Sequence, residues 1–198
     1  MAPLAESQPR GPAVTRGFVV AGGRSSRMGR DKARLPFRGS TLIEHAIANA
    51  RQAAPDIHIL CGPSRRYEEF GVPVIEDPVC GTGPVGGLYA ALLSASQDGR
   101  EQIFWLAVDL PLVSPKFLSS LVAELAGADV AMARTMRGVE PLCAAFRTEP
   151  TLAWVRQSLL EGRLKLTSAL EGLTLRLIDG EAADFANLNS PSDFERLL

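Results

Sequence analysis

Glycines and cationic side chains follow the first apolar stretch of the chain. Gly17 to Val20 predict a short strand, and the residues after it form a loop rich in glycine and arginine that ends at Lys32. Glycine lets a backbone approach a ligand closely, and successive N–H groups can surround an anion. Guanidinium and ammonium groups supply positive charge for phosphate. The sequence therefore predicts a polyphosphate-binding loop. Its binding groups would be Gly22, Gly23, Arg24, Arg27 and Lys32.

The spacing of these residues excludes two familiar phosphate loops. The P-loop pattern G-x-x-x-x-G-K-[ST] is not formed here, because Arg30 follows Gly29. The glycines at 22, 23 and 29 also do not fit the dinucleotide pattern G-x-G-x-x-G. Residue types alone leave a second interpretation open, a mobile basic surface loop, because glycine, arginine and serine are common in loops.

Two aspartates stand directly after predicted strands. Asp77 follows the strand expected over Val72–Glu76, and Asp109 follows the continuous apolar run Ile103–Val108. Such a run is typical of a strand buried on both faces. A carboxylate at a strand end is a hard oxygen ligand suited to Mg²⁺. The alternatives are a helix-capping or solvated role for Asp109 and a turn role for Asp77, which precedes a proline.

Predicted strands and helices alternate along the chain. Thr41 and Glu44 form a capping box that predicts a helix over Leu42–Gln52. Further helices are expected over 65–70, 88–96, 116–126, 152–161 and 164–170 and after Asp193, and further strands over 57–60, 130–133, 142–146 and 173–178, the last at an edge. This alternation predicts a Rossmann-like, doubly wound α/β fold, with a mostly parallel sheet in three layers, α/β/α. The chemistry of such sheets lies at the carboxyl ends of the strands, so the loop, Asp77 and Asp109 are expected on one rim.

Length and composition fit one domain over residues 17–198, preceded by a disordered tail over residues 1–16. The net charge of −1 gives no general basic field, so neither nucleic acid nor a membrane is an expected partner. No apolar run reaches the length of a membrane span, and the first residues lack the apolar core of a secretory signal. Three separated cysteines without a C-x-x-C pattern favour reduced thiols in a cytoplasmic protein. The two histidines, His45 and His58, are expected to be structural.

The order of residues in the loop resembles a known family. The run Ala21–Ala33, A-G-G-R-S-S-R-M-G-R-D-K-A, resembles the signature loop of nucleotidyltransferases that join a nucleoside triphosphate to a phosphorylated acceptor. Within that superfamily it is similar to the molybdenum cofactor guanylyltransferases. The related cytidylyltransferases tend to carry A-A-G at the start and Pro-Lys where this chain has Asp31-Lys32. The resemblance implies a sheet of the nucleotide-diphospho-sugar transferase type.

Later segments extend the resemblance over nearly the whole chain. They are Glu76-Asp77-Pro78, Gly83–Gly87, Asp109-Leu110-Pro111, Glu140–Ala144 and Asn187–Pro191. Two positions depart from the family pattern. Gly86 stands where the family has alanine, and the residues before Asp109 are purely apolar.

The resemblance implies roles for individual residues. Lys32, Arg24 and Arg27 would be the catalytic groups, and Asp109 would hold Mg²⁺, the implied cofactor. The nucleotide would be bound by Val20, Ala21, Gly22, Gly23, Lys32, Asp77, Gly83, Gly87 and Asp109. Asn187 and Asn189 would face the pterin acceptor. An Asx turn and a helix cap are local alternatives for these two asparagines.

The implied reaction transfers GMP from GTP to Mo-molybdopterin and releases pyrophosphate. A phosphate monoester has a second pKa of about 6, so its dianion is a nucleophile at neutral pH without a general base. Molybdoenzyme chaperones or other cofactor-biosynthesis proteins would be further partners. The alternatives are a cytidylyltransferase or sugar-phosphate nucleotidyltransferase of the same superfamily, a non-catalytic carrier of nucleotide or cofactor, and a phosphate-binding regulatory domain.

Overall fold

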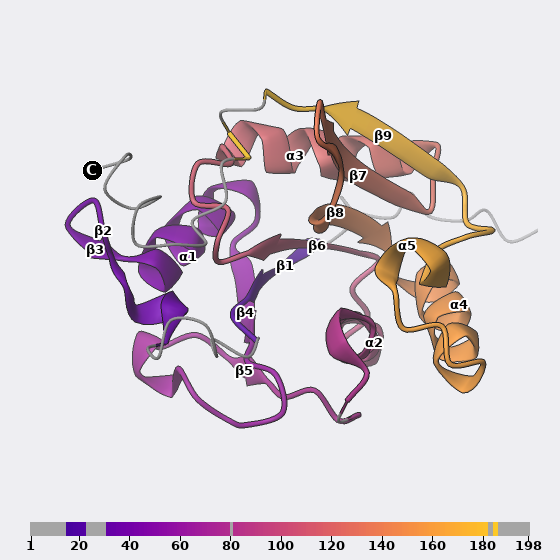
Figure 1. The fold of residues 1–198 in the computed structure, drawn as a ribbon, viewed down its shortest axis with the longest axis horizontal. Coiled ribbons are helices and arrows are strands. Elements are labelled where there is room, and N and C mark those ends of the chain that lie inside the picture. The colour runs from indigo at the N-terminus through magenta and orange to yellow at the C-terminus, as the bar shows by residue number, and fades with distance from the viewer. Residues whose placement is uncertain (1–14, 23–30, 80, 182–183, 186–198) are drawn as a thin grey trace, which may run out of the picture.

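The computed structural model describes residues 15–22, 31–79, 81–181 and 184–185. These residues form a seven-stranded sheet with helices on both faces, and a small separate hairpin (Figure 1). The strand order is β5-β4-β1-β6-β8-β7-β9. The strands of the large sheet are β1 (Thr15–Val20), β4 (Asp56–Leu60), β5 (Val74–Ile75), β6 (Gln102–Ala107), β7 (Val130–Thr135), β8 (Gly138–Arg147) and β9 (Leu175–Asp179). The hairpin consists of β2 (Pro36–Phe37) and β3 (Ser40–Thr41).

The helices connect successive strands. The α-helices are α1 (Leu42–Ala53), α2 (Gly83–Gln97), α3 (Pro115–Ala123), α4 (Thr148–Leu160) and α5 (Leu166–Ala169). Single 3-10 turns are η1 (Lys32–Arg34), η2 (Glu68–Phe70) and η3 (Glu124–Ala126). The predicted capping box of α1 is confirmed, because Thr41 and Glu44 each accept a hydrogen bond from the backbone N–H of the other.

Six strands of the sheet run in one direction and β8 runs in the other. β1 pairs in parallel with β4 and β6, β4 with β5, and β7 with β9. Only β8 pairs antiparallel, with β6 on one side and β7 on the other. The prediction of a mostly parallel, doubly wound sheet is therefore confirmed. Because β8 is reversed, it begins at the rim where its neighbours end.

The sheet separates two apolar cores. Alternate residues of β6 point to opposite faces, with Phe104 and Leu106 in one core and Ile103 and Trp105 in the other. The first core contains the buried faces of α1 and α3, and the second contains those of α2, α4 and α5. Figure 1 shows the two groups of helices on opposite sides of the strands. This burial on both faces fixes the central strands and the segments that leave their ends.

Several predicted boundaries shift. β1 begins at Thr15 rather than Gly17, and β8 extends four residues before and one residue after the predicted Leu142–Phe146. The predicted helix over 65–70 is wrong except for its last turn, η2, because Tyr67 has φ 79° and ψ 16°, a left-handed conformation that an α-helix excludes. The prediction that the last strand lies at an edge is confirmed by β9. The predicted helix after Asp193 lies outside the described residues.

Two further sequence expectations concern cysteines and membrane spans. Cys61 and Cys143 are buried and form no disulfide, and burial raises the pKa of both thiols. Among the helices of the described ranges, none has both the length and the apolar character needed to cross a membrane.

Candidate active site

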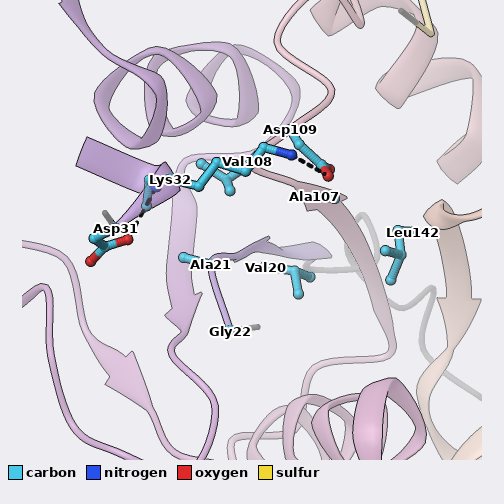
Figure 2. A pocket seen from close by; sticks show the side chains of 10 residues that line it. Val20, Ala21, Gly22, Asp31, Lys32, Ala107, Val108, Asp109 and Leu142 are labelled. Atoms are coloured by element: carbon cyan, nitrogen blue, oxygen red, sulfur yellow. Dashed lines mark hydrogen bonds and ion pairs between the residues drawn. The ribbon is translucent and has the colours of Figure 1, made fainter. Parts of the chain in front are cut away.

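A cavity of about 220 Å³ lies at the carboxyl ends of the two central strands. Its walls come from the end of β1, the start of η1, the end of β6 and one residue of β8 (Figure 2). The lining residues are Val20, Ala21, Gly22, Asp31, Lys32, Ala33, Ala107, Val108, Asp109 and Leu142. Five of the predicted site residues line this cavity: Val20, Ala21, Gly22, Lys32 and Asp109.

Lys32 and Asp109 form an ion pair across the cavity. The Lys32 Nζ lies 3.0 Å from Asp109 Oδ2, although the two residues are 77 positions apart in sequence. Figure 2 shows Lys32 reaching from η1 over the end of β1 to Asp109 after β6. The two side chains are only 17% and 27% exposed, so water screens this pair less than a surface pair. An ammonium donor and a carboxylate acceptor are thus held side by side.

Backbone contact requires glycine at position 22. A Cβ atom at Gly22 would lie 2.7 Å from the backbone nitrogen of Gly62 and 2.9 Å from its Cα. Gly62 follows β4, the strand beside β1, so the two strand ends pack backbone against backbone. This contact is the physical reason why the loop after β1 starts with a glycine.

Asp31 connects the cavity to several neighbours. Its Oδ1 accepts hydrogen bonds from the Ala33 backbone N–H at 3.1 Å and from the Tyr67 hydroxyl at 2.9 Å. Its Oδ2 lies 3.4 Å from Arg34 Nε and 3.8 Å from an Arg66 guanidinium nitrogen. The first contact makes Asp31 the N-cap of η1, the turn that begins at Lys32. Asp31 therefore fixes the start of the turn that carries Lys32.

Asp77 lies behind the cavity rather than in its wall. Its backbone N–H donates to the Gly62 carbonyl at 2.9 Å. Gly62 in turn packs against Gly22, so Gly62 separates Asp77 from the cavity wall. Its carboxylate accepts the Val79 backbone N–H at 2.9 Å, and burial raises the pKa of this carboxyl group. The structure thus places Asp77, which was expected on one rim with Asp109, beside the end of β4 and the start of α2, and not among the described residues that line the cavity.

The glycines of α2 occupy different environments. Gly83 begins the helix with φ 58°, a conformation that favours glycine. Gly87 lies one turn further on, and a Cβ atom there would meet no other atom within 4 Å. Gly86 is tightly packed, because a Cβ there would lie 2.8 Å from both Asp77 carboxylate oxygens. Neither Gly83 nor Gly87 lines the cavity.

Helix α1 anchors the turn that carries Asp109. The His45 Nε2 lies 2.9 Å from the Pro111 carbonyl oxygen, and the Asn49 side-chain amide donates to the carbonyls of Pro111 and Val113 at 3.4 and 3.2 Å. The Pro111 carbonyl is two residues beyond Asp109. The structural role predicted for His45 is therefore to hold this turn, together with Asn49.

An irregularity in β8 brings two further residues to the rim. The pairing of β7 with β8 jumps from Met132 opposite Ala144 to Ala133 opposite Glu140. Such bulges redirect side chains. Leu142, inside the irregular segment, lines the cavity. The pKa of Glu140 is raised by burial and, to a lesser degree, by the nearby charge of Asp109.

Other predicted site residues lie outside the described ranges. They are Gly23, Arg24, Arg27, Asn187 and Asn189. The residues that sequence reasoning missed are Asp31 as a cap, Tyr67, Asn49 and Leu142. One signal was available for Tyr67, since a tyrosine between Arg65-Arg66 and Glu68-Glu69 is a single aromatic residue in a charged segment.

The cavity suits a hard divalent cation that arrives with its substrate. Among the described residues, no group of three or more His, Cys, Asp or Glu side chains could hold a metal ion. Mg²⁺ commonly needs only one or two carboxylates, and substrate phosphates and water complete its coordination. The Asp109 carboxylate, partly exposed at the cavity, fits that requirement.

These features define a class of protein. A doubly wound sheet whose central strands end at a glycine-bearing loop, a lysine and an aspartate is the architecture of a nucleotide-binding α/β protein. Residues 17–173 match the family model described as MobA-like NTP transferase domain. The chain belongs to this family of nucleotidyltransferases.

Relatives cover nearly the whole chain. A protein of Opitutus terrae named probable molybdenum cofactor guanylyltransferase is 33% identical over 188 residues, which are 91% of this chain and 93% of that protein. The crystal structure of molybdopterin-guanine dinucleotide biosynthesis protein A from Archaeoglobus fulgidus matches with a TM-score of 0.71 and 25% identity, over 92% of this chain and 96% of that one. The 2-C-methyl-D-erythritol 4-phosphate cytidylyltransferase of Thermus thermophilus shares the fold, with a TM-score of 0.67, 18% identity and coverage of 91% and 95%.

Proposed function

We propose that this protein is a molybdenum cofactor guanylyltransferase, which transfers GMP from GTP to the phosphate of Mo-molybdopterin. The names of relatives at about a third identity over nine-tenths of the chain support this function. The observation that carries it is the Lys32–Asp109 pair in a cavity at the ends of β1 and β6. In this proposal the triphosphate lies in the cavity beside one cation, Lys32, and one carboxylate suited to a metal ion, Asp109.

The reaction needs alignment and charge neutralisation more than acid–base catalysis. An oxygen of the molybdopterin phosphate attacks the α-phosphorus of GTP, the bond from that phosphorus to the β-phosphate oxygen breaks, and pyrophosphate leaves with the bonding electrons. The attacking phosphate is largely a dianion at neutral pH, because its second pKa is about 6. Within the part of the chain that the structure describes, the polar side chains that line the cavity are those of Asp31, Lys32 and Asp109.

The chain's own residues have distinct roles in this proposal. Lys32 contacts the phosphates and offsets negative charge in the transition state. Asp109 would hold Mg²⁺, which would neutralise charge on the triphosphate. The glycine at position 22 would let the backbone come close to the phosphates, and the Asp77 segment would support the nucleotide side from behind Gly62, to which its backbone N–H donates. Two roles stay predictions from the sequence motifs. They are binding of the pyrophosphate end by Arg24 and Arg27, and contact with the acceptor by Asn187 and Asn189.

The fold does not choose between nucleotides, because a cytidylyltransferase shares it. The test is a parallel assay of GTP, CTP and UTP with Mo-molybdopterin and Mg²⁺, in which the dinucleotide product is identified by mass spectrometry. We expect the guanine dinucleotide from GTP and little product from the other two. Product from CTP alone would assign the protein to the cytidylyl branch. GTP binding without any dinucleotide would support a carrier or regulatory protein.

A further inference from the structure

Tyr67 is a buried residue in a conformation that tyrosine seldom adopts. It is 1% exposed and has φ 79°, in the left-handed region, where the backbone of residues other than glycine is strained. Strain of this kind persists only where the surrounding contacts determine the conformation. The contacts of the Tyr67 side chain therefore indicate what the strained conformation accomplishes.

The Tyr67 hydroxyl reaches both ends of the segment between β1 and η1. It donates a hydrogen bond to Asp31 Oδ1 at 2.9 Å and also lies 3.4 Å from the Ala21 carbonyl oxygen. One hydroxyl has one proton, so the shorter contact to the carboxylate is the stronger one. Ala21 follows β1, and Asp31 directly precedes Lys32. A single side-chain oxygen thus connects the end of the central strand to the residue before Lys32.

Two arginines complete this arrangement. The guanidinium carbons of Arg34 and Arg66 lie 5.5 and 5.0 Å from the centre of the Tyr67 ring, within the range of cation–π contacts. Both guanidinium groups also face the second carboxylate oxygen of Asp31. Burial raises the pKa of Tyr67, and its hydrogen bond to Asp31 raises the pKa further. The hydroxyl therefore keeps its proton and stays a donor at neutral pH. The Asp31 carboxylate is therefore held on both of its oxygens.

We propose that Tyr67 is a positioning residue that, through Asp31 and the cap of η1, holds the Lys32 ammonium group against Asp109 in the cavity. Tyr67 itself does not touch the cavity, since it is absent from the lining residues. Its effect passes from the hydroxyl to the Asp31 carboxylate, from there to the capped turn, and then along the Lys32 side chain. The catalytic consequence rests on the proposed function, whereas the placement of Lys32 does not.

The placement is testable without substrate. The chain has three lysines, Lys32, Lys116 and Lys165, so labelling by a water-soluble acylating reagent can be followed at each one by peptide mass spectrometry. In Tyr67→Phe, which keeps the ring and removes the hydroxyl, we expect Lys32 to label about tenfold faster than in the wild type, because a hydrogen bond to a charged group is lost. Lys116 and Lys165 serve as internal references and should not change.

Two other variants make the test specific. Tyr89→Phe changes the other tyrosine of the chain, on α2, and should leave Lys32 labelling unchanged. Asp31→Asn should accelerate labelling of Lys32 as Tyr67→Phe does, and the double variant should add little, because the two changes break one connection. Unchanged labelling of Lys32 in Tyr67→Phe would overturn the inference. An equal acceleration at all three lysines would also overturn it, since Tyr67 would then act on the whole fold.

The activity of the same variants separates this inference from the proposed function. If the wild type transfers GMP, Tyr67→Phe should lower kcat about tenfold with a small change in the KM for GTP, because a loosely held Lys32 is misaligned mainly in the transition state. An unchanged kcat would contradict the positioning role. If the wild type transfers no nucleotide, the proposed function is wrong, and the labelling result still decides whether Tyr67 holds Lys32.

Discussion

Opposite charges at the cavity keep each other in place. The ammonium group of Lys32 and the carboxylate of Asp109 are 3.0 Å apart and partly sheltered from water. Each group is therefore oriented before a triphosphate arrives, which lowers the entropic cost of aligning the reacting groups. In the proposed reaction Lys32 would turn to the phosphates, and the Asp109 carboxylate would hold the metal ion that accompanies them.

Replacement of Lys32 tests its charge directly. In Lys32→Ala we expect kcat to fall by about 10²- to 10³-fold, because a preorganised cation is lost at the developing negative charge. The protein should remain folded, as measured by circular dichroism. Lys165→Ala, a change at an exposed lysine, is the control and should keep full activity. Turnover of Lys32→Ala within a few-fold of the wild type would remove this lysine from the catalytic groups.

Elements of secondary structure place these residues through backbone contacts. Glycine at position 22 lets the end of β1 pack on Gly62 beyond β4, and α1 holds the turn after β6 through His45 and Asn49. The two sides of the cavity are thus fixed by different elements, which belong to one continuous core.

Substitution at Gly22 measures the first of these contacts. In Gly22→Ala the new Cβ would meet backbone atoms at 2.7 and 2.9 Å, and we expect a loss of about 1–3 kcal/mol in the free energy of unfolding. Gly87→Ala is the matched control, because its Cβ meets nothing and α2 should gain about 0.5–1 kcal/mol. Chemical denaturation of both variants gives the two values. Equal stability of Gly22→Ala and the wild type would show that the strand ends are not tightly packed.

Replacement of Asn49 tests the contact between α1 and the turn after β6. Asn49→Ala removes two hydrogen bonds to the turn after Asp109, and we expect a loss of about 1–2 kcal/mol in unfolding free energy together with a several-fold lower kcat. Gln52→Ala, on the exposed side of the same helix, should change neither quantity. A stable Asn49→Ala variant with full activity would mean that α1 does not position this turn.

Local signals of the sequence predicted the elements better than the contacts between them. The capping box at Thr41 and the apolar run of β6 depend on neighbouring residues. The capping box is confirmed, and the run forms a strand whose two ends each lie one residue earlier than predicted. The helix predicted over 65–70 includes Tyr67, whereas the buried Tyr67 side chain contacts Asp31, 36 positions away, and its backbone is left-handed. The charged residues on both sides of Tyr67 are visible in the sequence, but they do not show that its partner is Asp31.

At the scale of the whole molecule, the two ends of the sheet differ in chemistry. The carboxyl ends of β1 and β6 form the cavity, whereas the opposite ends hold a network of charges around Arg16, which is 3% exposed. Arg16 pairs with Asp56 at 3.0 Å and with Asp98 at 2.8 Å, and Arg100 lies 3.0 Å from Asp56. This network closes the amino-terminal side of β1 and β4. The sequence analysis places Arg16 at the end of a predicted disordered tail, whereas Arg16 is a buried residue of β1.

His58 makes this network sensitive to pH. Burial first, and the charge of Arg16 next, lower the pKa of His58 below its ordinary value of 6.5, although Asp56, 3.2 Å away, opposes the shift. The unfolded chain therefore binds more protons than the folded one below pH 6.5. Stability should be complete above that pH and should fall as the pH decreases toward the folded pKa.

The variant His58→Gln removes this proton-linked loss. We expect the melting temperature of the wild type to fall more steeply than that of His58→Gln between pH 7 and pH 5, measured by calorimetry in matched buffers. Carboxylates away from His58 contribute equally to both proteins, so the difference between the two curves reports on His58 and its contact with Asp56. A constant difference across this pH range would contradict the assigned direction.

The alternation of strands and helices was sufficient to predict the doubly wound sheet and the rim where Lys32 and Asp109 meet. It was not sufficient to show that Asp77 lies behind Gly62, because that position depends on how the turns after β4 and β5 pack.

A crystal structure of the protein with GTP and Mg²⁺ tests the central claim most directly. The triphosphate should lie in the cavity between β1 and β6, with the Lys32 Nζ within hydrogen-bonding distance of a phosphate oxygen and the metal ion on the Asp109 carboxylate. A nucleotide bound elsewhere on the molecule, with the Lys32–Asp109 pair intact, would contradict the account.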